Sequence, residues 1–196
     1  MYLSKLLLDK SQFAKYEVYD DYAIHKLVYS LFPAKAKEIQ ERILYLDKGA
    51  SGETRLILIQ SQQLPEPPKE LQMTSLQLND SFFAAPRYHF EVLLNPVRRS
   101  PASGKREALR GMLPLLSWFV RRCPGWGFSC EEASLQAFVK SSLYFKKNQQ
   151  SYRFNRVLFR GSLEVTDPAR FILAAKSGLG AGKAFGFGLL QLSRAK

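Results

Sequence analysis

Four residues near the start of the chain have the types and spacing needed for acid–base chemistry: Tyr22, His25, Lys26 and Tyr29. The apolar spacing of residues 16–32 predicts a helix. Residues three and four positions apart are neighbours on a helix, so Tyr22 and Tyr29 should both lie beside His25. Histidine exchanges protons near neutral pH, tyrosine donates hydrogen bonds and lysine carries a positive charge. This group could promote attack of an RNA 2′-hydroxyl on its own phosphate, which requires a base, an acid and donors to the charged intermediate.

The alternative is that these four side chains form an ordinary solvated helix face. The apolar residues of the same helix fall on a separate stripe that should face the core: Ile24, Leu27, Val28 and Leu31. No cluster of carboxylates suited to Mg²⁺ is evident, and the two cysteines and two histidines are too scattered for a zinc site. We therefore expect neither a metal nor a cofactor.

A glycine-rich segment with one lysine, residues 178–190, is the second chemical feature. Glycines let a backbone turn successive N–H groups towards an anion, and Lys183 adds a full positive charge, so a phosphate is the expected ligand. A nucleotide-binding P-loop does not fit, because Ser177 and Ala184 stand where it needs glycine and a hydroxyl residue. Residues 167–176 predict a preceding helix, so the segment joins a helix to a final strand. A flexible connection without a ligand is the alternative.

Two long strand-like stretches, residues 133–145 and 152–165, carry only basic charges between positions 140 and 160. Aromatic residues alternate with these charges. A two-stranded ribbon with a basic face fits phosphate contacts along a nucleic-acid stem, whereas the alternative is a solvated sheet face. The basic residues are Lys140, Lys146, Lys147, Arg153, Arg156 and Arg160.

The charge of the chain is unevenly distributed. Residues 1–97 contain 11 basic and 12 acidic residues, whereas residues 98–196 contain 18 basic and 5 acidic residues. A polyanion is the expected partner of the second half, and nucleic acid is favoured over a membrane surface, because no basic amphipathic helix is evident. No apolar run approaches the length of a spanning helix, and we expect no signal peptide. Cys123 and Cys130 are then expected to be reduced thiols in the cytoplasm.

The order of predicted elements indicates an α+β protein with two tandem ferredoxin-like (RRM-like) domains, residues 1–97 and 98–196. In this division the alternating strand 88–94 closes the first domain. The basic segment 98–106, rich in serine, proline and glycine, forms the boundary. A helix over residues 109–122 follows it.

Together these features resemble one family, the CRISPR repeat-processing endoribonucleases of the CasE type, which are subunits of Cascade. Residues 1–5 look like the opening strand of the family, and Tyr22-x-x-His25 is followed by the matching Leu-Phe-Pro of residues 31–33. Residues 95–98, Asn-Pro-Val-Arg, are similar to its junction motif. The most specific match is the glycine-rich signature, Gly-x-Gly-x-x-Lys-x-x-Gly-x-Gly-Leu-Leu, over residues 178–190.

The resemblance implies metal-independent cleavage of repeat stem-loops in CRISPR precursor RNA, leaving a 2′,3′-cyclic phosphate. It implies that His25 is the principal acid–base residue with Tyr22 as its partner. It also implies that the protein keeps its crRNA product within Cascade, beside CasC-like backbone and CasD-like subunits. Further residues expected to bind RNA are Lys26, Arg98, Arg99, Gly180, Gly182 and Lys183. The alternatives are a non-catalytic RNA-binding subunit on the same fold and a metal-dependent nuclease.

Overall fold

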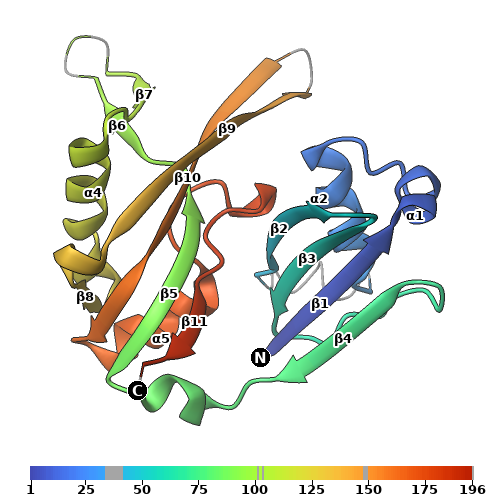
Figure 1. Ribbon diagram of the computed structural model, residues 1–196, viewed down its shortest axis with the longest axis horizontal. Helices are drawn as coiled ribbons and strands as arrows, with labels where there is room; N and C mark the ends of the chain where they lie inside the picture. Colours follow the sequence, from blue (N-terminus) through green and yellow to red (C-terminus); the bar gives the residue numbers. More distant parts are fainter. Residues whose placement is uncertain (34–41, 101, 103, 148–149, 196) are drawn as a thin grey trace.

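The computed structural model describes residues 1–33, 42–100, 102, 104–147 and 150–195, and it shows two lobes, each built on an antiparallel sheet (Figure 1). The sheet of the first lobe has the order β2-β3-β1-β4. Its first and third strands are therefore central, and its second and fourth strands lie at the edges. The strands are β1 (Tyr2–Asp9), β2 (Leu44–Ser51), β3 (Thr54–Ser61) and β4 (Gln72–Gln77).

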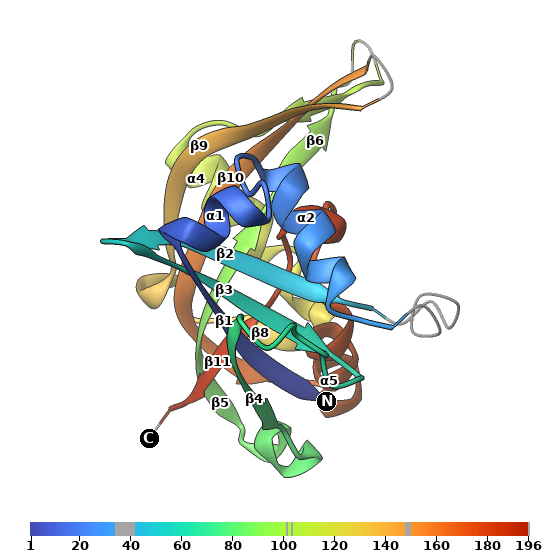
Figure 2. The same ribbon diagram turned by 90° about the vertical axis from the view of Figure 1, so that its right-hand side faces the viewer.

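Two helices cover one face of this sheet, α1 (Lys10–Lys15) and α2 (Asp21–Ser30) (Figure 2). The sequence predicted one helix over residues 16–32, but α2 begins only at Asp21, because the Asp20 carboxylate accepts a hydrogen bond from the Ala23 N–H at 2.7 Å and caps the helix there. The expected apolar stripe is confirmed: four residues of the stripe are buried in the core of the first lobe, namely Ile24, Leu27, Val28 and Leu31.

The second lobe contains a five-stranded sheet, four strands of which have the order β11-β5-β10-β8. The fifth strand, β9, pairs with the first part of the long strand β10, and β8 pairs with its last three residues. Two helices pack on it, and a small hairpin of two strands projects from it. The strands are β5 (Arg87–Leu94), β6 (Val97–Arg99), β7 (Arg106–Ala108), β8 (Phe128–Cys130), β9 (Gln136–Lys147), β10 (Gln150–Val165) and β11 (Gln191–Arg194). The helices are α4 (Met112–Val120) and α5 (Pro168–Ser177). Short 3-10 turns are η1 (Asp80–Ala84), η2 (Cys123–Trp126), η3 (Glu132–Ser134) and η4 (Lys183–Phe185).

The strand predicted to close the first domain belongs to the other sheet. β5 pairs with β10 and β11, and it is the first strand of the second lobe rather than the last strand of the first. The division at residue 97 therefore assigns this strand to the wrong sheet, and we propose a boundary in residues 78–86. With this correction both lobes share the strand arrangement of ferredoxin-like domains, as the sequence predicted.

The end of the chain follows its local signals closely. Asp167 caps α5 by accepting a hydrogen bond from the Arg170 N–H at 3.0 Å, and Pro168 occupies the first turn, as expected. Gly178 ends the helix with a φ of 78°, a conformation that favours glycine. The last strand starts at Gln191 rather than near Phe187, because Gly188 has a φ of 85° and interrupts the extended backbone.

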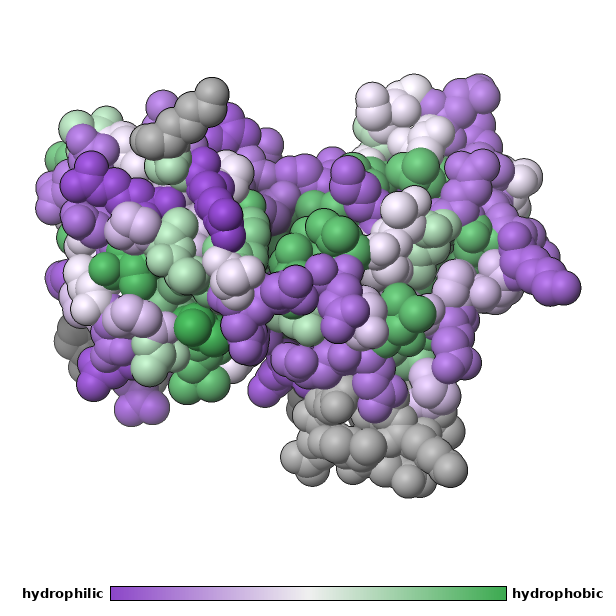
Figure 3. Space-filling view, turned by 90° about the horizontal axis from the view of Figure 1, so that it is seen from below, coloured by the Kyte–Doolittle hydropathy of each residue, from purple (hydrophilic) through white to green (hydrophobic). Residues whose placement is uncertain are grey.

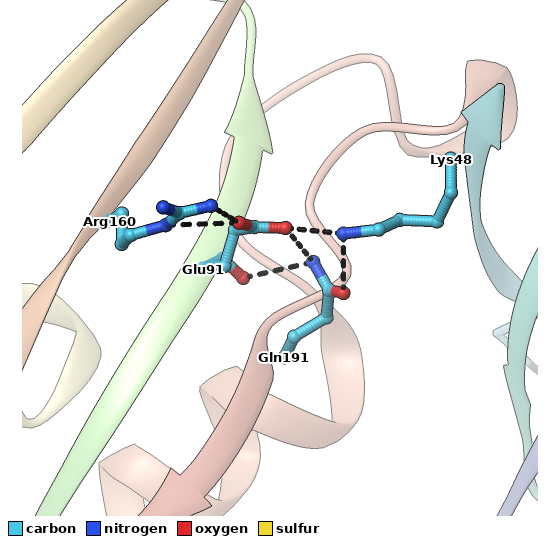
Figure 4. A network of polar contacts seen from close by, with 4 residues as sticks. All are labelled: Lys48, Glu91, Arg160 and Gln191. Atoms are coloured by element: carbon cyan, nitrogen blue, oxygen red, sulfur yellow. Dashed lines mark hydrogen bonds and ion pairs between the residues drawn. The ribbon is translucent and has the colours of Figure 1, made fainter. Parts of the chain in front are cut away.

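A separate apolar cluster joins the two lobes. It contains buried residues of β2, β5, β9 and the glycine-rich segment: Leu44, Leu46, Leu93, Leu143, Phe187 and Leu189. Polar contacts also cross the interface at Glu91, which binds Lys48 of the first lobe together with Arg160 and Gln191 of the second (Figure 4). The lobes are therefore held against each other by both apolar and polar contacts.

One face of the molecule is mainly polar. On the face shown in Figure 3, both lobes are covered largely by hydrophilic residues, with smaller hydrophobic areas between them.

Cys123 is buried and Cys130 is partly exposed, and both thiols are free. Among the described residues, no helix is long and apolar enough to cross a membrane.

Candidate active site and nucleic-acid interface

The side chain of His25 contacts the glycine-rich segment of the other lobe. Its Nδ1 lies 2.7 Å from the backbone oxygen of Ala184. A carbonyl oxygen only accepts hydrogen bonds, so Nδ1 is the donor, and in the neutral ring the lone pair is on Nε2. The contact therefore fixes both the orientation of the ring and the nitrogen that is able to accept a proton.

Aromatic side chains surround this histidine. The ring centroids of Tyr22, Tyr29 and Phe185 lie 5.9, 4.3 and 5.8 Å from that of His25. The predicted neighbours at positions −3 and +4 are thus confirmed, while Phe185 comes from the other lobe. Burial raises the pKa of Tyr29, so its hydroxyl stays protonated at neutral pH. The Lys26 ammonium lies 5.5 Å above the Tyr22 ring, on the exposed side of α2.

The glycine-rich segment packs closely on β2, and this explains two of its glycines. At Gly178, where φ is 78°, a Cβ atom would lie 2.7 Å from the Leu44 side chain. At Gly186, where φ is 80°, it would lie 3.2 Å from the Tyr45 ring. The Tyr45 hydroxyl donates to the Ala184 oxygen at 3.2 Å, so the carbonyl that holds His25 is itself held by the first lobe. These glycines therefore serve packing between the lobes as well as any anion binding.

Lys183 lies one residue before the carbonyl that binds His25. Its side chain is half-buried, and burial, with a smaller effect of the nearby Arg42 charge, lowers the pKa of its ammonium group. Arg42 also acts on the pKa of Tyr29. Arg42 thus lies close enough to act on both Lys183 and Tyr29, a ring neighbour of His25, and it is a residue that the sequence analysis above did not name. The sequence signal that could have identified Arg42 is its position, two residues before the buried strand β2.

The basic ribbon β9–β10 extends away from the second sheet in both views (Figures 1 and 2). A cavity of about 640 Å³ lies at its base. Three basic residues of the ribbon, Lys140, Arg153 and Arg156, line it together with Arg110 and with Ala181 of the glycine-rich segment. One surface therefore connects the ribbon to the loop that contacts His25, and Arg110 is a residue that the sequence analysis missed.

Two of the predicted ribbon cations have acidic partners in space. Arg160 donates to Glu91, its register partner on β5, with Nη2 at 2.7 Å from the carboxylate (Figure 4). Arg156 has its Nη1 3.9 Å from Asp21 of α2. The sequence between residues 140 and 160 contains no acid, but neighbouring elements supply two, so these arginines connect structural elements.

The remaining predicted residues are distributed more widely. Arg98 and Arg99 lie on β6 and line a second cavity with Gly180. Gly182 has a φ of 84° and lies beside Phe187. Lys146 and Lys147 end β9, but their side chains lie outside the described part of the structure. Among the described residues, no group of three or more His, Cys, Asp or Glu side chains could hold a metal ion.

A family model described as CRISPR associated protein matches residues 1–194. The chain belongs to this family. It is 28% identical to the CRISPR-associated endoribonuclease Cse3 of Thermus thermophilus over 98% of this chain and 100% of the relative. It is also 23% identical to the CRISPR system Cascade subunit CasE of Escherichia coli, over 98% of this chain and 99% of the relative.

Solved structures of family members superpose on both lobes. The structure of Thermus thermophilus Cse3 bound to an RNA representing a pre-cleavage complex is 27% identical, covers 98% of each chain and has a TM-score of 0.83. Cas6e of Escherichia coli is 22% identical, covers 100% of each chain and has a TM-score of 0.77, which supports the fold.

Proposed function

We propose that this protein is a CRISPR-associated endoribonuclease that cuts precursor RNA at repeat stem-loops and keeps the crRNA product as a subunit of Cascade. The relatives named above are an endoribonuclease and a Cascade subunit, and they match this chain over nearly its full length. The observation that carries the proposal is the contact of His25 Nδ1 with the Ala184 oxygen, beside a basic cavity. It orients a proton-exchanging group where a bound phosphate would lie.

In the proposed reaction, the RNA supplies its own nucleophile. The 2′-hydroxyl attacks the adjacent phosphorus, the bond to the 5′-oxygen of the next nucleotide breaks, and a 2′,3′-cyclic phosphate and a 5′-hydroxyl result. The 2′-oxygen loses a proton and the leaving 5′-oxygen gains one; His25 Nε2 carries out one of these two transfers and water the other, while the Tyr22 hydroxyl assists as a hydrogen-bond donor. Lys183 and the loop amides stabilise the charge on the phosphorane oxygens. The mechanism uses side chains of this protein and no metal.

The RNA stem is proposed to bind along the ribbon and its cavity. Lys140 and Arg153 are exposed there and are positioned to contact phosphates, and Arg110 extends the same basic surface. Arg156 and Arg160 have acidic partners and contribute less. Partners in the complex would be CasC-like backbone and CasD-like subunits, and the proposed site of action is the cytoplasm.

The test is cleavage of the repeat RNA of the host in EDTA. His25→Ala should lose cleavage by about 10²–10⁴-fold while it still binds the stem. His89→Ala is the matched control, because His89 is the other histidine of the chain and lies on β5, with its Nδ1 3.1 Å from the Ser162 hydroxyl oxygen. RNA with a single 2′-deoxy substitution at the cut should resist the wild-type protein.

The alternative of a non-catalytic RNA-binding subunit predicts a different outcome. Tight binding without cleavage by the wild-type protein would favour it, and the protein would then protect or assemble processed RNA. Cleavage that stops when EDTA is added would instead favour a metal-dependent nuclease.

A further inference from the structure

We infer that a second cavity, which shares lining residues with the larger one, binds unpaired nucleotides that flank the RNA stem next to the cut. This inference rests on the proposed function. The cavity has a volume of about 360 Å³ and contains three arginines and both tryptophans of the chain. Its main lining residues are Arg98, Arg99, Trp118, Arg122, Trp126 and Ala181.

The cavity has a preformed stacking platform. The Arg122 guanidinium lies 4.4 Å above the centre of the Trp118 ring. That ring is only 7% exposed, and its Nε1 donates to the Val97 oxygen at 3.2 Å, so it is a fixed support. Arg122 itself is exposed. A guanidinium plane held in this way can stack on an RNA base, as arginine does in recognition of unpaired bases.

The charge of the cavity fits the phosphates of such a strand. Arg98 has one acidic neighbour, Glu107, whose oxygen lies 3.9 Å away with both side chains exposed. Within the described residues, Arg99 and Arg122 have no acidic partner within 4.0 Å. Two full positive charges are thus left uncompensated beside the stacking platform.

The position of the cavity identifies the part of the RNA that would enter it. Ala181 lines both this cavity and the larger one at the base of the ribbon, and the cavities also share Asn95 and Val97. Ala184 is three positions after Ala181 in the chain, a span of at most about 10 Å when the chain is extended. RNA whose cleaved bond lies at His25 therefore reaches the cavity within a few nucleotides. A paired stem is too wide for this volume, whereas single bases can turn outwards and stack.

Intrinsic fluorescence provides a direct test, because both tryptophans line the cavity. The full-length protein is titrated with four RNAs: the stem-loop alone, with a 5′ flank, with a 3′ flank, and with both. At least one flank should tighten binding by fivefold or more and quench the tryptophan fluorescence, since stacking of one base contributes about 1–3 kcal/mol. The fluorescence of Trp126→Phe identifies which indole senses the flank.

The variants are chosen to separate this site from the stem site. Arg122→Ala should lower the affinity for flanked RNA to that of the wild-type protein for the bare stem. Arg121→Ala is the matched control, because Arg121 is also exposed at the end of α4 but lines a different pocket with Leu113 and Glu132. It should keep the advantage of the flanked RNA.

The outcomes distinguish failure of this inference from failure of the proposed function. If the bare stem is bound and the flanked RNA is cut but no flank improves binding, the cavity is not a nucleotide site. The same conclusion follows if Arg122→Ala weakens bare and flanked RNA equally. If wild-type protein neither binds the bare stem nor cuts the flanked RNA, the proposed function itself fails.

Discussion

Removing the charge of Arg156 should destabilise the protein more than removing the charge of its partner Asp21. The two groups connect β10 of the second lobe to the first turn of α2, with Arg156 Nη1 3.9 Å from Asp21 Oδ1. Their side chains are 21% and 30% exposed, and Arg156 Nε is buried with no hydrogen-bond partner among the described residues. At an effective dielectric of about 20, the attraction at this distance is about 4 kcal/mol, before the cost of desolvation.

The cost of desolvation decides the asymmetry. Burial raises the pKa of Asp21 even though the Arg156 charge opposes the shift. A raised pKa means that the folded state holds the proton more tightly, so this group stabilises the fold below its unfolded pKa and loses that contribution as the pH rises through its folded pKa. At pH 7 the ionised Asp21 therefore depends on Arg156. Without Arg156 it would be a partly buried and poorly compensated charge.

We expect Arg156→Met to lower the free energy of unfolding by about 2 kcal/mol, less than the 3–5 kcal/mol for a fully buried pair. Asp21→Asn should leave the free energy of unfolding at pH 7 unchanged or raise it slightly, because the raised pKa means that ionisation of Asp21 opposes folding. The double variant should be more stable than Arg156→Met alone. Methionine keeps the apolar stem of the arginine, so the change reports the charge. Urea unfolding of all four proteins at pH 7, followed by circular dichroism, gives the coupling energy.

A matched control is the exposed pair Lys10–Glu53, whose side chains are 67% and 77% exposed. Its coupling energy should be within about 0.5 kcal/mol of zero, and that of Arg156 and Asp21 should be about 1–2 kcal/mol. Equal coupling energies for the two pairs would refute this reasoning. If Arg156→Met instead reduces the salt dependence of RNA binding by about one phosphate contact, Arg156 binds the stem, as its place on the basic ribbon first indicated.

Three further predictions concern the loop, the interface and the ribbon. Gly186→Ala should lower the free energy of unfolding by about 1–3 kcal/mol and slow cleavage more than it weakens binding, because a Cβ at φ 80° meets Tyr45 and displaces the loop that holds His25. Urea unfolding measures the first effect, and single-turnover cleavage measures the second. Burial opposes ionisation of Glu91, but hydrogen bonds from Lys48 and Arg160 outweigh the effect of burial and lower the pKa of this carboxyl. The ionised Glu91 therefore stabilises the fold above its unfolded pKa, and this contribution is lost as the pH falls through its folded pKa. Glu91→Gln should therefore be less stable than wild type at pH 7, with a smaller difference near pH 3, and an equal difference at both values would contradict this assignment. Arg153→Ala should reduce the salt dependence of stem binding by about one phosphate contact without changing the rate at which bound RNA is cleaved. An unchanged slope would remove Arg153 from the interface.

The sequence could predict most elements of the fold, because each depends on local signals. Asp167, Pro168 and Gly178 predicted the bounds of α5 to within one residue. The partner of a strand depends on other parts of the chain. The alternation of residues 88–94 shows that one face is buried, but it is the same in either sheet, so periodicity could not assign β5 to the second lobe.

The same distinction between local signals and distant parts of the chain applies to the candidate site. Helical spacing was sufficient to place Tyr22 and Tyr29 beside His25, since these neighbours lie on one helix. The Ala184 oxygen is 159 residues away in sequence and is a backbone atom, so no residue type indicated it. The acidic partners of Arg156 and Arg160 were missed because only strand pairing and packing bring them close.

The division of the site between two lobes has a mechanistic consequence. The half of the chain up to residue 97 has almost no net charge and provides His25, whereas the other half has the excess of basic residues and provides Ala184. Binding of RNA can therefore rest mainly on the second lobe, but the orientation of His25 requires contact between both. The apolar cluster around Leu44 and Phe187 keeps that contact in place. Changes at this interface should thus affect cleavage before they affect stem binding, even at positions that touch neither the RNA nor His25.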